Sequence, residues 1–130
     1  MTTMNININI RTLKVTEHVK RDRWDRITDC IKAVGGIGEV MIAIDSTKRK
    51  YTNERVIQVL TSTGMIFVIN VDRNTLITAY LCNMSLACAM YGAHGYNRVP
   101  NHLYRTIDYN QRYNSRLYSY YIWFEFQPRL

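Results

Sequence analysis

Four short segments rich in β-branched, aliphatic and aromatic residues follow one another in the middle of the chain. They comprise residues 39–45, 55–60, 65–71 and 75–81. Their length and composition are typical of β-strands. Gly64 and the Asp72-Arg73-Asn74 cluster separate the last three segments by short turns, so these strands are expected to be antiparallel. Residues 65–71 are almost entirely apolar, which predicts a central strand that is covered on both faces.

A helical pattern precedes these strands. Thr16 and Glu17 supply a plausible N-cap and a first-turn acid, and Gly35-Gly36 supplies the end of the helix. The apolar stripe of this helix consists of Val15, Val19, Ile27, Cys30, Ile31 and Val34. Arg23 projects toward the same stripe, which predicts either a break in the helix or a buried guanidinium.

The rest of the chain contains two further helical patterns and two alternating ones. Residues 85–91 predict a short helix that is capped by Ser85 and ended by Gly92, and residues 92–99 predict a loop. Residues 100–114 predict an amphipathic helix with Pro100 in its first turn. Residues 4–10 alternate Asn with apolar residues, as a short strand or a pairing arm does, and residues 117–126 predict a last strand.

These patterns together predict a single α+β domain over residues 1–130. Its N-terminal helix packs on a four- to five-stranded antiparallel sheet, followed by short C-terminal helices and an aromatic tail strand. Residues 1–12 form an N-terminal arm, and residues 115–130 form an aromatic C-terminal extension. A chain of 130 residues can bury a core without metals or disulfides.

Charge and composition narrow the classes of partner. Seventeen Lys and Arg residues against ten Asp and Glu residues give a net charge of +7, which favours a polyanionic partner such as nucleic acid. Cys30, Cys82 and Cys88 lack CxxC spacing, so neither a zinc site nor a disulfide framework is predicted, and no cofactor is expected. The sequence predicts a cytoplasmic protein without a membrane partner, because no apolar run approaches the roughly twenty residues of a membrane span.

Three motifs carry a family resemblance between about Thr16 and Tyr109. They are EHVKRDRW at residues 17–24, TSTG at residues 61–64 and LITAY at residues 76–80. With these motifs the chain resembles small prophage-type proteins of the barnase–colicin–RelE (BECR) superfamily of metal-independent ribonucleases. The resemblance implies an endoribonuclease in which the 2′-hydroxyl attacks the neighbouring phosphorus, leaving a 2′,3′-cyclic phosphate and a 5′-hydroxyl.

The resemblance also implies roles for five residues. His18 would be the general base, since an unperturbed imidazole titrates in the useful range, and Arg21 would stabilise the charge of the transition state. These two residues lie three apart and therefore share a helix face. Thr61 and Thr63 would orient the phosphate, and Tyr80 would be the acid or a platform for base stacking.

Structural readings of the same residues stay open. His18 with Asp22 is typical of a surface ion pair, and the Thr-rich segment suits a tight turn or bulge equally well. Tyr80 also fits a half-buried sheet position. His94, in a glycine-flanked loop, is an alternative base, and His102 is a weaker candidate.

Cations interleaved with aromatic residues mark a second set of candidates, for nucleic-acid binding. Base stacking on tyrosine combined with phosphate contacts by arginine is how single strands are held without sequence readout. The candidate residues are Lys48, Arg49 and Lys50 beside Tyr51, together with Arg98, Arg105, Arg112 and Arg116. Solubility is the alternative explanation for such a basic surface.

The sequence is thus compatible with three alternative functions. The first is the metal-independent endoribonuclease, toxin-like and of bacterial or phage origin, with RNA such as tRNA as substrate and an antitoxin as a further partner. The second is a non-catalytic phage-type protein that binds a host protein or nucleic acid, for example as a defence-system inhibitor. The third is a plain RNA-binding module. The tail from Leu117 to Phe126 is additionally expected to pair within the sheet or to form a homodimer.

Overall fold

The computed structural model describes residue 10 and residues 13–15, 17–45 and 54–118, without the side chains of His18 and Asp22. Five strands and four helices are assigned in this part of the chain. In chain order they are β1 (Lys14–Val15), α1 (Glu17–Asp22), α2 (Trp24–Val34), β2 (Val40–Asp45), β3 (Val56–Thr61), β4 (Met65–Asn70), β5 (Thr75–Leu81), α3 (Met84–Ala93) and α4 (Asn101–Tyr113). The protein is therefore α+β, as the sequence predicts.

The five strands form one mixed sheet in the order β1-β5-β4-β3-β2. The pairs β2–β3, β3–β4 and β4–β5 are antiparallel, as the short turns between them predict. Every residue of the central strand β4 is buried, which confirms the prediction for this apolar segment. Asn74 has a φ of 50° in the β4–β5 turn, a left-handed conformation that asparagine tolerates well.

The prediction of a wholly antiparallel sheet is wrong at one edge. Lys14 and Val15 pair in parallel with Thr75 and Leu76 of β5. Two residues are too short a segment to show an alternating pattern, so this strand could not be recognised in the sequence. Of the predicted strand over residues 4–10, only Ile10 lies within the described residues, in a 3₁₀ turn.

The predicted N-terminal helix is interrupted at Arg23, the residue at which the sequence predicts either a break or a buried guanidinium. Arg23 lies in a turn between α1 and α2. Its Nη1 donates a hydrogen bond of 3.1 Å to the carbonyl oxygen of Ile77 in β5. Ile77 lies where the β4–β5 register shifts, since Val68 pairs with Thr78 but Ile69 pairs with Leu76. The guanidinium thus binds a backbone carbonyl at an irregularity of the sheet.

The C-terminal helices differ from their predictions at their ends. Asn83, rather than Ser85, caps α3, because its side chain accepts a hydrogen bond from the Leu86 amide. Gly92 lies inside α3, which ends one residue later at Ala93. The predicted helix over residues 100–114 is α4, with Pro100 as its N-cap residue.

The tail begins differently from the predicted strand. Leu117 and Tyr118 belong to a short helical turn over residues 115–118, and both are buried. The Tyr118 hydroxyl donates a hydrogen bond of 2.9 Å to the carbonyl oxygen of Cys82. The prediction of a strand is therefore wrong for Leu117 and Tyr118, which lie in a helical turn that buries both side chains in the core. The remainder of the tail lies outside the described residues.

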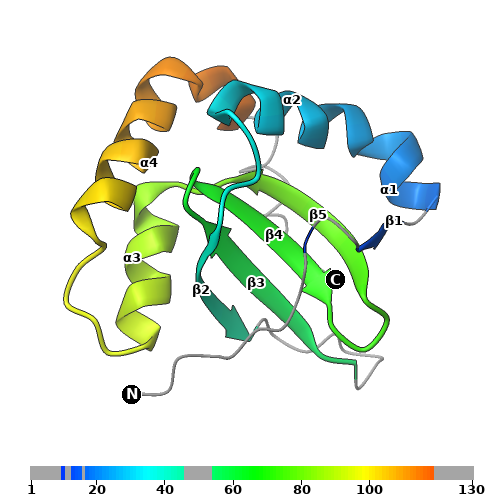
Figure 1. The fold of residues 1–130 in the computed structure, drawn as a ribbon, viewed down its shortest axis with the longest axis horizontal. Coiled ribbons are helices and arrows are strands. Elements are labelled where there is room, and N and C mark those ends of the chain that lie inside the picture. Colours follow the sequence, from blue (N-terminus) through cyan, green and yellow to red (C-terminus); the bar gives the residue numbers. More distant parts are fainter. Residues whose placement is uncertain (1–9, 11–12, 16, 46–53, 119–130) are drawn as a thin grey trace.

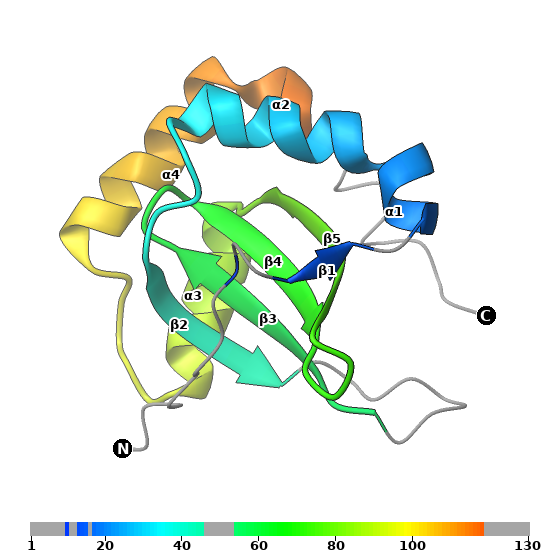
Figure 2. The same ribbon diagram turned by 45° about the vertical axis from the view of Figure 1, so that its right-hand side comes forward.

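Three helices follow one another in an arc above the sheet, in the spatial order α4, α2 and α1 (Figure 1). The same order is visible after rotation by 45° (Figure 2). α1 and α2 contact β5, whereas α3 contacts β2 and α4. The C-terminal end of α2 and the side of α4 thus face each other across the end of the sheet at which β3 turns into β4.

Candidate nucleic-acid interface

A cationic and aromatic surface runs along α4 and the residues on either side of it. Between residues 98 and 118 the chain has four arginines and one acidic residue, Asp108. All four arginines, Arg98, Arg105, Arg112 and Arg116, are exposed. The surface therefore carries a local excess of positive charge, as a site for a phosphate backbone requires.

Tyrosine rings are exposed on the same helix. Tyr104, Tyr109 and Tyr113 are 51%, 58% and 70% exposed. The Tyr109 and Tyr113 rings lie one helical turn apart, with their centroids at 4.6 Å and an angle of 40° between their planes. Exposed aromatic faces of this kind are the usual platforms for unpaired bases.

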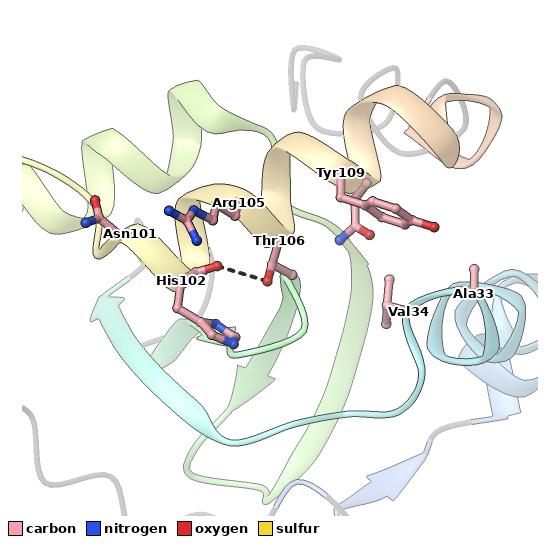
Figure 3. A pocket seen from close by; sticks show the side chains of 8 residues that line it. Ala33, Val34, Asn101, His102, Arg105, Thr106 and Tyr109 are labelled. Carbon is pink, nitrogen blue, oxygen red and sulfur yellow. Dashed lines mark hydrogen bonds between the residues drawn. The ribbon is translucent and has the colours of Figure 1, made fainter.

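A groove of about 600 Å³ separates α4 from the C-terminal end of α2. It is lined by Ala33, Val34, Asn101, His102, Arg105, Thr106, Tyr109 and Asn110. Figure 3 shows Ala33 and Val34 on α2 beside Tyr109, with His102, Arg105 and Asn101 toward the N-terminal end of α4. Spacings of three and four residues bring the α4 side chains to one side of the helix.

The polar residues of the groove differ in how they are held. Thr106 donates a hydrogen bond from Oγ1 to the carbonyl oxygen of His102, within the helix (Figure 3). In the part of the chain that the structure describes, the side chains of Asn101, His102 and Arg105 have no hydrogen-bond or ion-pair partner. These three side chains are thus available to a ligand in the groove.

Arg112, in contrast, is paired. Its Nε lies 3.2 Å from Oδ2 of Asp108, one turn earlier on α4. The Arg112 and Asp108 side chains are 70% and 45% exposed, and such surface pairs contribute little to stability. Exchange of this carboxylate for a phosphate would therefore cost the protein little free energy.

A buried amide fixes α4 against the sheet. Asn110 is 3% exposed, and its Nδ2 donates a hydrogen bond of 3.0 Å to the carbonyl oxygen of Thr63 in the β3–β4 turn. Gly64 approaches the same amide so closely that an added Cβ would lie 2.8 Å from Asn110 Nδ2. The Thr-Ser-Thr-Gly turn thus positions the helix that carries the arginines and tyrosines.

His18 and Arg21 were expected to lie next to Thr61 and Thr63, but they lie at the opposite end of the sheet from these threonines. His18 and Arg21 are on α1, which follows β1 where Val15 pairs with Leu76 near the start of β5. Thr61 and Thr63 are at the other end of the sheet, where the Cys82 amide binds the Gly64 carbonyl oxygen just after β5. The eleven residues of α2, about 16 Å long, separate the two groups. The structure does not bring them together.

The two threonines are engaged in structural hydrogen bonds. Thr61 is fully buried, and its Oγ1 lies 3.3 Å from Oγ1 of Thr63. Thr63 donates from Oγ1 to the carbonyl oxygen of Ile37, at 3.0 Å, and so ties the turn to the segment that leaves α2. Tyr80 is 4% exposed, on β5 opposite Ile66. The tight-turn interpretation of the threonines fits these contacts.

The other candidates are distributed as follows. His94 Nε2 donates a hydrogen bond of 2.6 Å to the carbonyl oxygen of Ala43, so this imidazole joins the loop after α3 to strand β2. Lys48, Arg49 and Lys50 lie outside the described residues. His102, the weakest histidine candidate in the sequence, is the one that lines the groove. The three- and four-residue spacing of His102, Arg105 and Tyr109 on a predicted amphipathic helix was the sequence signal that these side chains share one helix face.

Within the described residues, no three His, Cys, Asp or Glu side chains lie close enough to hold a metal ion together. None of the helices described is long and apolar enough to cross a bilayer. Burial raises the pKa of the Cys82 thiol to about 12, so this cysteine is protonated at neutral pH.

Comparisons of the chain with protein-family models, with curated proteins and with solved structures find no match.

Proposed function

We propose that this protein binds single-stranded RNA along α4 and the groove beside it. The observation that carries the proposal is the groove itself, in which Arg105 and His102 have no protein partner among the described residues and lie on the same helix as the exposed Tyr109. Arginine suits phosphate oxygens because its planar guanidinium donates two parallel hydrogen bonds. Tyrosine accepts any base by stacking, so the proposed binding depends little on sequence.

A single strand fits this surface better than a duplex does. The bases of a duplex are stacked on each other and cannot reach an aromatic side chain without being extruded. The bases of a single strand are free to lie on Tyr109 and Tyr113 while the backbone follows the arginines. Stacking contributes about 1–3 kcal/mol per base, and each arginine adds a salt-dependent phosphate contact.

Titration of a fluorescent oligouridylate at several salt concentrations tests this proposal. For four phosphate contacts the slope of log K against log[salt] is expected to be about −3. Replacing Arg105 and Arg112 by Gln should weaken binding and reduce the steepness of the slope by about 1.4. The charge-matched control replaces exposed Lys14 and Lys20 by Gln, and it should retain the wild-type slope. No binding by the wild type, or equal losses in both double variants, would refute the proposal.

Metal-independent RNA cleavage is the second candidate, and it continues the resemblance to the BECR ribonucleases. The specific observation in its favour is that His102 and Arg105 repeat, inside the groove, the three-residue spacing of His18 and Arg21. His102 would accept the proton of the 2′-hydroxyl as its oxygen bonds to phosphorus. Arg105 would bind the charged phosphorane, and the P–O5′ bond would break with water protonating the leaving oxygen.

Incubation of the purified protein with total tRNA in EDTA tests the second candidate. Fragments ending in a 2′,3′-cyclic phosphate are expected from the wild type, and they should disappear in His102→Ala but persist in His18→Ala. Loss of these fragments in His18→Ala alone would instead place the active site on α1. Intact tRNA at every protein concentration would eliminate cleavage and leave RNA binding as the function.

A further inference from the structure

The groove between α2 and α4 divides into two chemically different ends. Ala33 and Val34 present aliphatic side chains from α2, and the Tyr109 ring lies beside them (Figure 3). This end offers two apolar walls. Such a slot is suited to a flat, weakly polar ring, which gains dispersion and stacking energy on both of its faces.

The other end of the groove is polar and cationic. Arg105 precedes Tyr109 by one helical turn, and His102 precedes Arg105 by three residues. Asn101 adds an amide with both donor and acceptor atoms. With an arginine that has no partner among the described residues, this end is suited to a phosphate and to the hydroxyls of a sugar.

Four residues, about 6 Å of rise along the helix axis, separate the backbone positions of Arg105 and Tyr109. A nucleotide places its phosphate and its base on opposite sides of the sugar, and these two groups match the two ends in order. The volume of about 600 Å³ also falls within the roughly 300–1,000 Å³ that is usual for small-molecule sites. Size and chemistry therefore agree on a ligand of this class.

We propose that the groove is a pocket for one nucleotide, with its base between Tyr109 and the Ala33–Val34 wall and its phosphate on Arg105. The inference rests on the proposed RNA-binding function and makes it specific, since one base of the bound strand leaves its neighbours and enters the pocket. The remaining nucleotides lie on the outer face of α4. A free mononucleotide has the same base, sugar and phosphate as a nucleotide of the bound strand, so the experiment compares the two ligands.

A substitution that fills the pocket separates this inference from surface binding. Ala33 is exposed on α2 and lines the groove, so Ala33→Trp places a large ring in the position of the base without disturbing the core. Ala89 is also an exposed helical alanine, on α3 and away from the groove, and Ala89→Trp is the matched control. Equal melting temperatures of the two variants and the wild type establish that both are folded.

The ligands are an oligouridylate, an oligomer of the same length and charge without bases, and uridine monophosphate. Stacking of the one base in the pocket should make the oligouridylate bind the wild type about 5- to 150-fold more tightly than the abasic oligomer, and stacking on Tyr113 adds to this ratio. This ratio should fall in Ala33→Trp and persist in Ala89→Trp. If the wild type binds uridine monophosphate and Ala33→Trp does not, the pocket is supported and also takes free nucleotides. If the wild type binds only the oligomer, with the same dependence on Ala33, the pocket takes a nucleotide within a strand.

The inference is overturned if the ratio is the same in Ala33→Trp and in the wild type, even though both bind the oligouridylate. That result would leave RNA binding in place and confine it to the outer face of α4. Absence of oligouridylate binding by the wild type is a different result, because it removes the proposed function itself. Should Ala33→Trp fail to fold, Ala33→Phe takes its place in the same comparison, and an unchanged ratio in that variant overturns the inference.

Discussion

The side chain of Asn110 on α4 donates a hydrogen bond of 3.0 Å from Nδ2 to the carbonyl oxygen of Thr63. Its Oδ1 accepts a hydrogen bond from Asn114 Nδ2, at 3.2 Å, so both ends of this buried amide are engaged. A buried amide is tolerated only when its polar atoms have partners. The contact joins the helix that carries the proposed RNA surface to the turn that the sequence pattern assigned to phosphate binding.

Replacement of Asn110 by Ala should lower the free energy of unfolding by about 1–3 kcal/mol, since the Thr63 carbonyl loses its partner and a cavity is left. Urea denaturation followed by circular dichroism measures the change. Asn101→Ala, an exposed asparagine of the same helix, is the control and should change stability by less than about 0.5 kcal/mol. Equal effects of the two substitutions would contradict the structural role of Asn110.

Alanine at Gly64 should destabilise the protein more than alanine at Gly35. Both glycines have positive φ, at 87° and 83°, so the backbone strain is similar. An added Cβ at Gly64 meets Asn110 Nδ2 at 2.8 Å, whereas at Gly35 it has nothing within 4 Å. Thermal melting of the two variants compares them, and an equal loss would mean that the close approach of α4 to the turn is unimportant.

The three cysteines should differ sharply in reactivity toward an alkylating reagent at neutral pH. Cys88 is exposed, whereas Cys30 and Cys82 are buried. Burial also keeps the Cys82 thiol protonated, and the thiolate is the reactive form. Mass spectrometry should therefore find one rapid addition in the folded protein and three in urea. Rapid labelling of Cys82 in the folded state would contradict its burial.

Stability should fall as the pH rises above about 9. Burial raises the pKa of the Cys82 thiol from 9.0 to about 12, and burial likewise raises the pKa of Tyr118 above its ordinary 10.0. The unfolded chain therefore releases these protons at a lower pH than the folded chain does. The stabilisation is complete below pH 9 and is lost as the pH approaches the folded values, by at most about 1.4 kcal/mol per pH unit for each group.

Urea denaturation at intervals between pH 8 and 11, under reducing conditions, measures this dependence. Cys82→Ala removes one of the two groups and should therefore show a shallower decline than the wild type. A free energy of unfolding that stays constant across the range would be inconsistent with buried, protonated Cys82 and Tyr118 side chains.

Much of the fold could be predicted because its patterns are local. The β4 segment is continuously apolar and is wholly buried, and the Asp72–Asn74 cluster forms the expected turn. Arg23 could be recognised as irregular because a cation on an apolar stripe needs a polar partner, which is the Ile77 carbonyl. Strand β1 was missed, since two residues carry no periodicity and their pairing with β5 is a long-range contact.

The candidate site could be predicted only in part. The arginines of α4 stand out in the sequence by their spacing among tyrosines, and they are exposed as expected. The groove could not be foreseen, because it depends on the C-terminal end of α2 facing α4 across the β3–β4 turn. Thr61 and Thr63 looked suited to a phosphate, but their hydroxyls are directed into the hydrogen bonds that close this turn.

Amide chemical-shift mapping with ¹⁵N-labelled protein and an oligouridylate locates the surface that binds RNA. Shifts are expected to concentrate on residues 98–113 and on the end of α2 at Ala33 and Val34, and to saturate as the oligomer is added. Shifts concentrated instead on α1 and the start of β5, or no shifts at low salt, would contradict the assignment of RNA binding to α4.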